Sequence, residues 1–211
     1  MSFDAEDHYR SFTKDEVNTL PLFRYEGNVG LVRTPADLKI AIERIRQEKL
    51  LGFDTESRPC FTKGASSLPA LIQVACSDIV FLFQLTWLSF DKKIASILAD
   101  EDLIKTGVAI GDDIRMLAKM HRFTGAGLVD LKEVALAKGL ATQGLRPLAA
   151  NFLHVRISKN AQCSNWEHKE LTPQQIAYAA TDAWISRQIY ERMSELGFFS
   201  EATTFSIYPG E

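Results

Sequence analysis

The sequence predicts a single α/β domain built on a mixed β-sheet. Short apolar runs alternate with segments of helical periodicity along most of the 211 residues. The runs 70–76 and 79–85 are separated by only two residues, which predicts an antiparallel hairpin. Later runs are separated by helical segments, as parallel strands require. Hydrophobic content of 46% and charged content of 24% fit one globular domain of ordinary size.

Residues 1–27 are expected to form an appendage before a globular domain that spans 28–211. Thr13-Lys14-Asp15-Glu16 has the form of a capping box, which predicts a short helix that ends before Pro21. Strands are expected over residues 28–33, 50–56, 70–76, 79–85, 103–110 and 128–130. The strand over 50–56 should be central, because the apolar runs on both sides of it in the chain can pair with it.

Helices are expected between and after these strands, and three of them have clear start signals. Thr34 and Thr172 are N-caps, each followed by a proline, and Pro147 falls in a first turn where proline is tolerated. The expected helices cover residues 34–49, 91–98, 113–121, 131–138, 144–152 and 173–196. Residues 58–67 and 157–169 are polar and irregular, and are expected to be loops.

Charge and composition exclude several classes of protein. The net charge of −3 argues against a protein that coats duplex nucleic acid, although an enzyme that holds a few nucleotides remains compatible with it. No apolar run approaches the ~18 residues of a membrane span, and the polar, acidic N-terminus does not resemble a signal peptide. Cys60, Cys76 and Cys163 form no Cys-x-x-Cys pair, which predicts reduced thiols and a cytoplasmic protein.

Two carboxylates, Asp54 and Glu56, end the apolar run Leu50-Leu51-Gly52-Phe53. Side chains alternate along a strand, so both should project from one face while Thr55 points away. Paired carboxylates at the end of a buried strand repel each other unless a cation lies between them, and such oxygen ligands suit Mg²⁺ or Mn²⁺. A strand end that simply reaches solvent is an equally weighted alternative.

Two further acidic positions follow later in the chain. Asp112 and Asp113 open a predicted helix, where capping of the helix N-terminus is an alternative to metal binding. Tyr178 and Asp182 lie one turn apart on the last helix, and alone such a pair is more often a surface hydrogen bond. Small residues around this pair would let the helix approach another element closely: Ala177, Ala179 and Ala180.

Together these residues resemble the tyrosine-bearing branch of the DEDD exonuclease superfamily, the family of ribonuclease D and the Werner-type exonuclease domain. The resemblance covers about residues 31–190. Its motifs match Phe53-Asp54-Thr55-Glu56, then Gly107, Asp113 and Leu117, then Leu171-Thr172, Gln175, Tyr178-Ala179-Ala180 and Asp182. Supporting matches are Ala70-Leu71-Ile72-Gln73 and Ser164-Asn165-Trp166. Asp112 does not fit the register of the second motif, and Ala177 stands where the sibling branch carries histidine.

The resemblance implies a ribonuclease H-like fold with a five-stranded mixed sheet flanked by helices. It also implies a metal-dependent 3′–5′ exonuclease that releases nucleoside 5′-monophosphates from the single-stranded 3′ end of DNA or RNA. Two ions, Mg²⁺ or Mn²⁺, would be bound by Asp54, Glu56, Asp113 and Asp182, with Asp54 between them. Tyr178, whose ordinary pKa is near ~10, would orient water and phosphate as a hydrogen-bond donor and not act as the main base.

Three residues near the last helix are candidates for substrate contact: Arg146, Lys159 and Trp166. Arg58, just after the first motif, is a weaker candidate. Isolated cations suit phosphates and aromatic walls suit unstacked bases, but ordinary packing or solvation is an alternative for each. The sequence allows two other functions: that of a noncatalytic nucleic-acid-binding or scaffold protein on the same fold, and that of an endonuclease.

Overall fold

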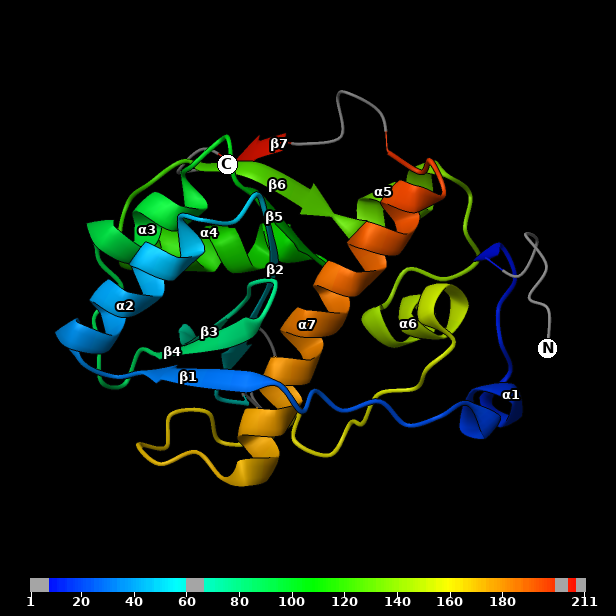
Figure 1. Ribbon diagram of the computed structural model, residues 1–211, viewed down its shortest axis with the longest axis horizontal. Coiled ribbons are helices and arrows are strands. Elements are labelled where there is room, and N and C mark those ends of the chain that lie inside the picture. The colour runs from blue at the N-terminus through cyan, green and yellow to red at the C-terminus, as the bar shows by residue number, and fades with distance from the viewer. Residues whose placement is uncertain (1–7, 60–66, 200–204, 208–211) are drawn as a thin grey trace.

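A seven-stranded mixed sheet forms the centre of the molecule (Figure 1). The computed structural model describes residues 8–59, 67–199 and 205–207. The strand order across the sheet is β1-β4-β3-β2-β5-β6-β7, so β2, which carries Asp54 and Glu56, is the central strand as predicted. The strands are β1 (Asn28–Val32), β2 (Leu50–Ser57), β3 (Pro69–Ala75), β4 (Ile79–Gln84), β5 (Ile104–Gly107), β6 (Gly125–Asp130) and β7 (Phe205–Ile207).

Pairing within the sheet follows the lengths of the connections. The short link between β3 and β4 gives an antiparallel pair, which confirms the predicted hairpin, and β3 is also antiparallel to β2. The pairs β2–β5 and β5–β6 are parallel, and both need a long connection: β3, β4 and α3 lie between the strands of the first pair, and α4 between those of the second. At the two edges, β1 is parallel to β4 and β7 is antiparallel to β6.

Seven helices in the described residues surround the sheet. They are α1 (Lys14–Thr19), α2 (Pro35–Ile45), α3 (Lys92–Leu98), α4 (Ile110–Met120), α5 (Leu131–Ala137), α6 (Leu145–Leu153) and α7 (Pro173–Glu195). Complete capping boxes at Thr13, Thr34 and Thr172 begin α1, α2 and α7, as the sequence predicted. No helix among these residues has the length and apolar character that crossing a membrane demands.

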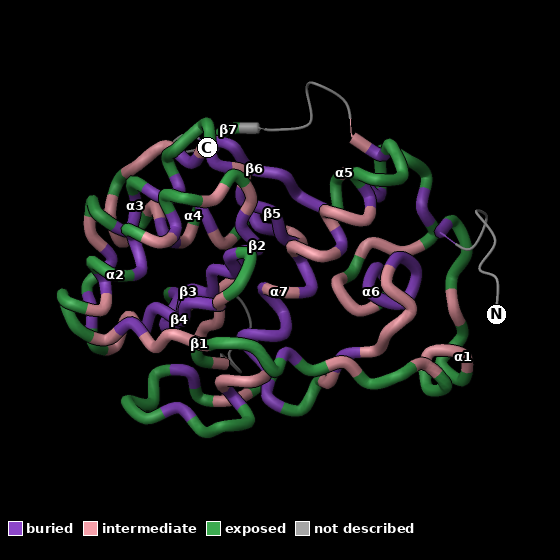
Figure 2. Tube along the Cα trace, in the orientation of Figure 1, coloured by how far each residue is buried: buried purple, intermediate pink, exposed green. Residues whose placement is uncertain are grey.

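The two faces of the sheet are covered by different helices (Figure 1). One core lies between the sheet and α2, α3 and α4. A second core lies under α7, which crosses the other face, and a third joins α7 to α5 and α6. Every residue of β3, the neighbour of the central strand, is buried (Figure 2), so polar groups inside it require specific partners.

The predicted mixed α/β class is confirmed, but the expectation of five strands is wrong. The strand expected over 28–33 pairs at one edge as β1, and β7 adds a seventh strand that no sequence pattern had indicated. β7 is only three residues long, which is too short for a readable alternation of apolar and polar positions. Most of the loop expected over 58–67 lies outside the described residues.

The strand expected over 103–110 ends earlier than predicted. Ala109 has φ 59°, in the left-handed region, and this turn separates β5 from α4. The backbone N–H of Ala109 donates to Asp130 Oδ1 over 2.9 Å, which stabilises the turn from the neighbouring strand end. The apolar run Val108-Ala109-Ile110 therefore contains the start of a helix and not the end of a strand.

Residues 20–25 cross one end of α7 and are called the N-terminal strap here. Phe23 N–H donates to Arg156 O, Arg156 N–H donates to Pro21 O, and Tyr25 N–H donates to Thr181 Oγ1 on α7 over 3.0 Å. Upstream of the strap, His8 stacks on Phe152 of α6 with ring centroids 4.9 Å apart. The segment expected to be an appendage is thus packed against the domain between residues 8 and 27.

Candidate active site

The central strand presents its alternate residues to different helices. Asp54 and Glu56 point toward α7, and Gly52 on the same face lies directly beneath that helix. A Cβ atom on Gly52 would lie 2.0 Å from Ala183 O, so only glycine permits this approach. Of the three small residues that predicted a close approach of this helix, Ala179 and Ala180 are fully buried, while Ala177 is half-buried. Ala183, one turn further along, is also fully buried.

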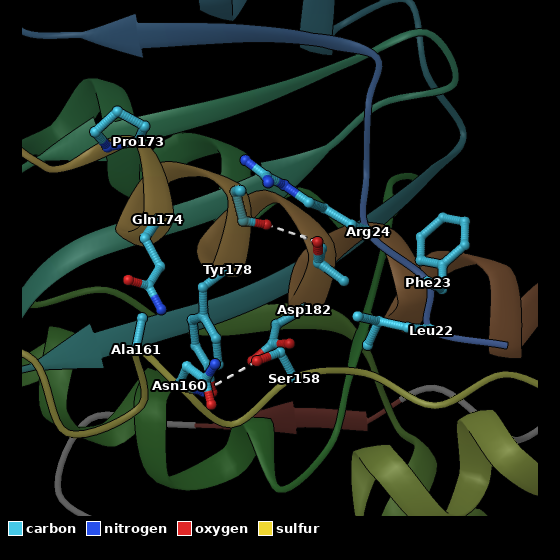
Figure 3. A pocket seen from close by; sticks show the side chains of 12 residues that line it. Leu22, Phe23, Arg24, Ser158, Asn160, Ala161, Pro173, Gln174, Tyr178 and Asp182 are labelled. Carbon is cyan, nitrogen blue, oxygen red and sulfur yellow. Dashed lines mark hydrogen bonds between the residues drawn. The ribbon is translucent and has the colours of Figure 1, made fainter. Parts of the chain in front are cut away.

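The approach of α7 to β2 brings three carboxylates together. Oxygen atoms of Asp54, Glu56 and Asp182 all lie within 4.8 Å of one another. Asp182 is 5% exposed. Tyr178, one turn earlier, lies beside Asp182 in Figure 3. The structure therefore places four of the predicted site residues, distant in sequence, at one point on the sheet.

Asp113 reaches this point from the opposite face. Thr55, which points away from Asp54, donates its hydroxyl hydrogen bond to Asp113 Oδ1 over 2.5 Å. Asp113 is also the carboxylate whose negative charge contributes most to the raised pKa of Asp54. Asp113 lies outside the group of three close carboxylates, but its charge still raises the pKa values of Asp54 and Glu56.

The neighbouring Asp112 points elsewhere. Its side chain is 88% exposed and forms an ion pair with Arg115 over 3.1 Å. Neither aspartate caps α4 through its side chain, because both lie within the helix and its N-cap is Ala109. The geometry thus separates the two aspartates and favours Asp113 for the site.

Burial and mutual repulsion oppose ionisation of the clustered carboxylates. Burial, followed by the charges of Asp113, Asp182 and Glu56, raises the pKa of Asp54 well above its ordinary value. Burial and the charges of Asp182 and Asp113 raise the pKa of Glu56 to about 9. Burial also raises the pKa of Asp182 to about 7, against the lowering effect of the Tyr178 hydrogen bond.

The Asp113 carboxyl responds to the same forces more weakly. Burial raises its pKa to about 6, while the hydrogen bond from Thr55 acts in the lowering direction. Four acids with raised pKa values in one place are an arrangement that a nearby positive charge would relieve. Such perturbed groups are typical of functional sites.

Tyr178 is held protonated at neutral pH. Burial and the charges of Asp182 and Glu56 raise its pKa above the ordinary value, and its hydroxyl bonds to the Asp182 carboxylate. Trp166 lies behind it, with ring centroids 6.0 Å apart. A protonated phenol is a hydrogen-bond donor and not a base, which agrees with the role expected from the resemblance.

The carboxylate group has the donor chemistry for a divalent cation. Asp182 Oδ1 is buried and has no hydrogen-bond partner among the described residues. A buried carboxylate oxygen without a donor is costly unless a cation supplies the missing interaction. Carboxylate oxygens are the ligands that Mg²⁺ and Mn²⁺ prefer, so these residues fit the metals that the sequence predicted.

A cleft of about 330 Å³ opens over the carboxylates and includes Arg146 in its wall. Arg146 donates to Gln162 Oε1 over 3.2 Å, and its buried Nε has no partner among the described residues. Burial raises the pKa values of Tyr178 and Asp182, and the positive charge of Arg146 opposes that rise in both. Of the three predicted substrate-contacting residues, Arg146 is the one that the structure brings to the carboxylates.

Trp166 and Lys159 do not have the surroundings expected of substrate contacts. Trp166 is only 1% exposed and is packed in the core behind Tyr178, which favours the alternative of ordinary packing over contact with a base. Lys159 is exposed and lines neither pocket next to Tyr178. Arg58 forms an exposed ion pair with Glu167 over 3.5 Å.

Several residues that surround the carboxylates have a place in the structure that the sequence does not indicate. Alternation along the strand predicts only that Thr55 points away from Asp54, and Gln73 enters only as a supporting match to the family motif. Gln73 is the cross-strand partner of Asp54, is fully buried, and has no partner for its side-chain amide among the described residues. Leu22 and Arg24 of the strap line a second pocket beside Tyr178, and no local sequence pattern connects them with α7.

Comparisons with known proteins agree with this geometry. Residues 29–197 match the family model described as "3'-5' exonuclease". A relative from Drosophila melanogaster, "Exonuclease 3'-5' domain-containing protein 2", is 33% identical over 150 residues, which are 69% of this chain and 25% of that protein. The chain thus spans about a quarter of the length of that relative.

Solved structures share the fold. The Aedes aegypti Nibbler EXO domain superposes with a TM-score of 0.73 and 22% identity, covering 82% of this chain and 90% of that domain. Trypanosoma brucei RNase D in complex with RNA U12 gives 0.71 and 18% identity, covering 90% and 66%. The fold is therefore the ribonuclease H-like one that the resemblance implied. Since the family model covers most of the sequence, the chain belongs to the 3′–5′ exonuclease family of the DEDD superfamily.

Proposed function

We propose that this protein is a metal-dependent 3′–5′ exonuclease that hydrolyses the terminal phosphodiester of a nucleic acid strand and releases nucleoside 5′-monophosphates. The observation that supports this most directly is the group of carboxylate oxygens of Asp54, Glu56 and Asp182 within 4.8 Å of one another. Asp113 stands beside them, and Tyr178 and Arg146 complete the cleft.

In this proposal Asp54, Glu56 and Asp182 would hold one divalent cation, and Asp54 and Asp113 a second. When bound, two such ions neutralise the clustered carboxylates and stabilise charge on the attacking and leaving oxygens. The four carboxylates supply ligands and do not need to act as bases. Their raised pKa values in the metal-free protein mean that protons and cations compete for the same oxygens.

Tyr178 and Arg146 would act on the substrate from the protein side. The protonated Tyr178 hydroxyl has one hydrogen to donate, and the Asp182 carboxylate accepts it in the metal-free protein. With Asp182 engaged by a cation, this hydroxyl would donate instead to water or to a phosphate oxygen. Arg146, in the wall of the same cleft, carries the positive charge that binds a phosphate and orients it for attack. The core packing of Trp166 behind Tyr178 keeps the phenol in place.

The proposal is tested by incubating purified protein with a single strand labelled at its 3′ end, and separately at its 5′ end. Mg²⁺ or Mn²⁺ should give a labelled mononucleotide from the first substrate and a stepwise ladder from the second. Asp54→Asn should abolish both products. A protein that binds a 3′ end but never shortens it under saturating metal would instead be the noncatalytic scaffold, and cleavage of a circular strand would indicate an endonuclease.

Matched DNA and RNA strands should be compared in the same assay. The 2′-hydroxyl is the group that distinguishes the two polymers, and the carboxylates and Tyr178 act on the phosphate, which both share. The Trypanosoma brucei neighbour is a complex with RNA, which makes RNA a natural first substrate. The proposal requires hydrolysis of at least one of the two.

A further inference from the structure

A second pocket, of about 460 Å³, is lined by Tyr178 and Asp182 (Figure 3), which also line the carboxylate cleft. The two pockets share only these two residues, so they meet along this short part of α7. Whatever occupies the second pocket lies next to the atoms that would surround the scissile phosphate. Its volume is within the range of small-ligand sites.

The N-terminal strap builds one wall of this pocket. Leu22 extends toward Asp182 in Figure 3, and it is 54% exposed although it is a large apolar side chain. Arg24 lies beside α7, and the described residues offer its guanidinium no hydrogen bond or ion pair. The opposite wall is formed by Ala161, Pro173 and Ala177.

The strap is fixed on both sides of these residues. Before and between them, the backbone of residues 21 and 23 is bonded to Arg156, and Arg156 Nε donates to Leu20 O over 3.1 Å. After them, Tyr25 N–H donates to Thr181 Oγ1, which itself donates to Ala177 O over 2.6 Å. An exposed leucine and an unpaired arginine are therefore presented by a backbone that cannot easily withdraw.

The presence of Arg24 in the pocket wall indicates which nucleotide of the strand the pocket suits. On the 3′ side of the scissile bond a strand has one nucleoside, which ends in a hydroxyl group. On the 5′ side it has a nucleoside followed by another phosphate. A pocket with apolar walls and an arginine suits a base together with a phosphate, so it suits the 5′ side.

Resting on the proposed exonuclease function, we propose that this pocket is the subsite for the nucleotide immediately upstream of the scissile phosphate. Its base would lie between Leu22 and the wall that contains Ala161 and Pro173. Its own 5′-phosphate would pair with Arg24. The strap is then part of the substrate-binding surface, and the enzyme grips two successive nucleotides in two pockets that share Tyr178.

Dinucleotides test this subsite because they contain one scissile bond and one upstream nucleotide. Three forms are compared, each made with deoxyribose and with ribose: one with a 5′-phosphate, one without it, and one that has the phosphate but lacks the upstream base. Wild-type protein should prefer the first form over each of the others by roughly threefold to tenfold in kcat/KM, as one charge-assisted or stacking contact predicts.

Two variants should remove these preferences separately. Arg24→Gln should abolish discrimination for the 5′-phosphate but keep discrimination for the base, and Leu22→Ser should do the reverse. Lys39→Gln is the charge-matched control, because Lys39 is exposed on α2, on the opposite face of the sheet, and should leave both preferences intact. Circular dichroism melting checks that all three variants fold.

Binding of the same dinucleotides, titrated in Ca²⁺, separates this inference from the proposed function. If nothing is hydrolysed but binding still depends on the 5′-phosphate through Arg24, the subsite is supported and the exonuclease proposal fails. If hydrolysis occurs and Arg24→Gln and Leu22→Ser retain the wild-type preferences, the exonuclease proposal stands and the subsite is overturned. The subsite is also overturned if both variants bind the dinucleotides with the same preferences as the wild type.

Discussion

Thr55 and Asp113 are joined by a hydrogen bond across the end of the central strand, from the Thr55 hydroxyl to Asp113 Oδ1. The two residues lie on the face of β2 opposite to Asp54 and Glu56, yet Asp113 contributes to the raised pKa of Asp54. One strand thus positions carboxylates on both of its faces. Asp54 and Glu56 are carried by the strand itself, and Asp113 is held through Thr55.

Replacing Thr55 should therefore weaken metal activation specifically. In Thr55→Val the Asp113 carboxylate loses its donor, so we expect the metal concentration for half-maximal activity to rise, while Thr55→Ser should behave like the wild type. Loss of one hydrogen bond to a charged group also predicts a stability decrease of about 1.5–3 kcal/mol. Metal titration of the exonuclease rate is the measurement, and an unchanged midpoint in Thr55→Val would contradict this role.

Stability of the metal-free protein should fall as the pH rises. Folding raises the pKa values of Asp113, Asp182 and Glu56 to about 6, 7 and 9, so between their ordinary values and these values the folded state binds more protons than the unfolded state. The free energy of unfolding then decreases with pH across the window from about 4 to about 9. Thermal melting in a chelator from pH 5 to pH 9 should show it.

Neutralising one carboxylate should reduce this pH dependence. Asp182→Asn removes one of the charges that raise the pKa of Glu56, so we expect it to melt at a higher temperature than the wild type in chelator at pH 8. The same substitution removes a proposed metal ligand, so added Mg²⁺ should stabilise it less. A clear drop in melting temperature without metal would show that the carboxylates do not repel one another as described.

Gly52→Ala should be destabilising out of proportion to its size. The added methyl group would meet Ala183 O at 2.0 Å, so α7 must move away from β2. Overpacking of this kind costs about 1–3 kcal/mol, and displacement of Asp182 should also lower activity. Gly111→Ala is the control, because a Cβ there meets the flexible end of Arg115 at 3.3 Å and alanine favours a helix. Denaturant unfolding compares the two, and equal stabilities would argue against the close contact.

Trp166→Ala should reduce the stability of the protein, whereas replacing an exposed stacking residue would leave stability nearly unchanged. Trp166 is buried, so its removal leaves a cavity that costs about 3–5 kcal/mol. Trp166→Phe should restore most of the stability and the support of Tyr178. Chemical denaturation of both variants is the measurement. A Trp166→Ala protein as stable as the wild type but with weaker substrate binding would return this residue to the surface role expected from the sequence.

Arg146 should contribute to substrate binding more than to folding. Arg146→Met keeps the apolar stem but removes the charge, and we expect KM for an oligonucleotide to rise about tenfold, as loss of one charged hydrogen bond predicts. Arg146→Lys should recover part of this effect, since lysine keeps the charge without the planar group. Steady-state kinetics with saturating metal provide the test. A fall in kcat with unchanged KM would instead place Arg146 in the chemical step.

The residues of the candidate site could be found in the sequence because their signals are local. Alternation along 50–56 places Asp54 and Glu56 on one face, and helical spacing places Tyr178 above Asp182. That these two segments meet could be stated only through the resemblance, since no pattern in a single sequence reports contacts between distant elements. The alanines of α7 nonetheless indicated that this helix packs closely against another element. On the sheet, the absence of a side chain at Gly52 is what allows α7 to approach β2.

What the sequence did not predict depends on tertiary contacts. Trp166 looked like an aromatic wall because composition alone does not distinguish a buried ring from an exposed one. β7 has only three residues, and its pairing with β6 is decided by the available sheet edge. The strap has no periodic pattern at all. Its place on α7 depends on hydrogen bonds from the strap backbone to Arg156 and Thr181. These bonds use main-chain atoms of the strap, so the side chains there leave no sign of them in the sequence.

The strap also bears on where this chain can be shortened. The family match begins at residue 29, which invites a version that starts with β1. Such a protein would leave Thr181 Oγ1 without its backbone donor and would strip Tyr25 from the ring of Trp184, whose centroid is 4.8 Å away. The family match therefore begins inside a set of residues that contact one another, and we expect a shortened protein to keep its stability only if it reaches back at least to Leu20.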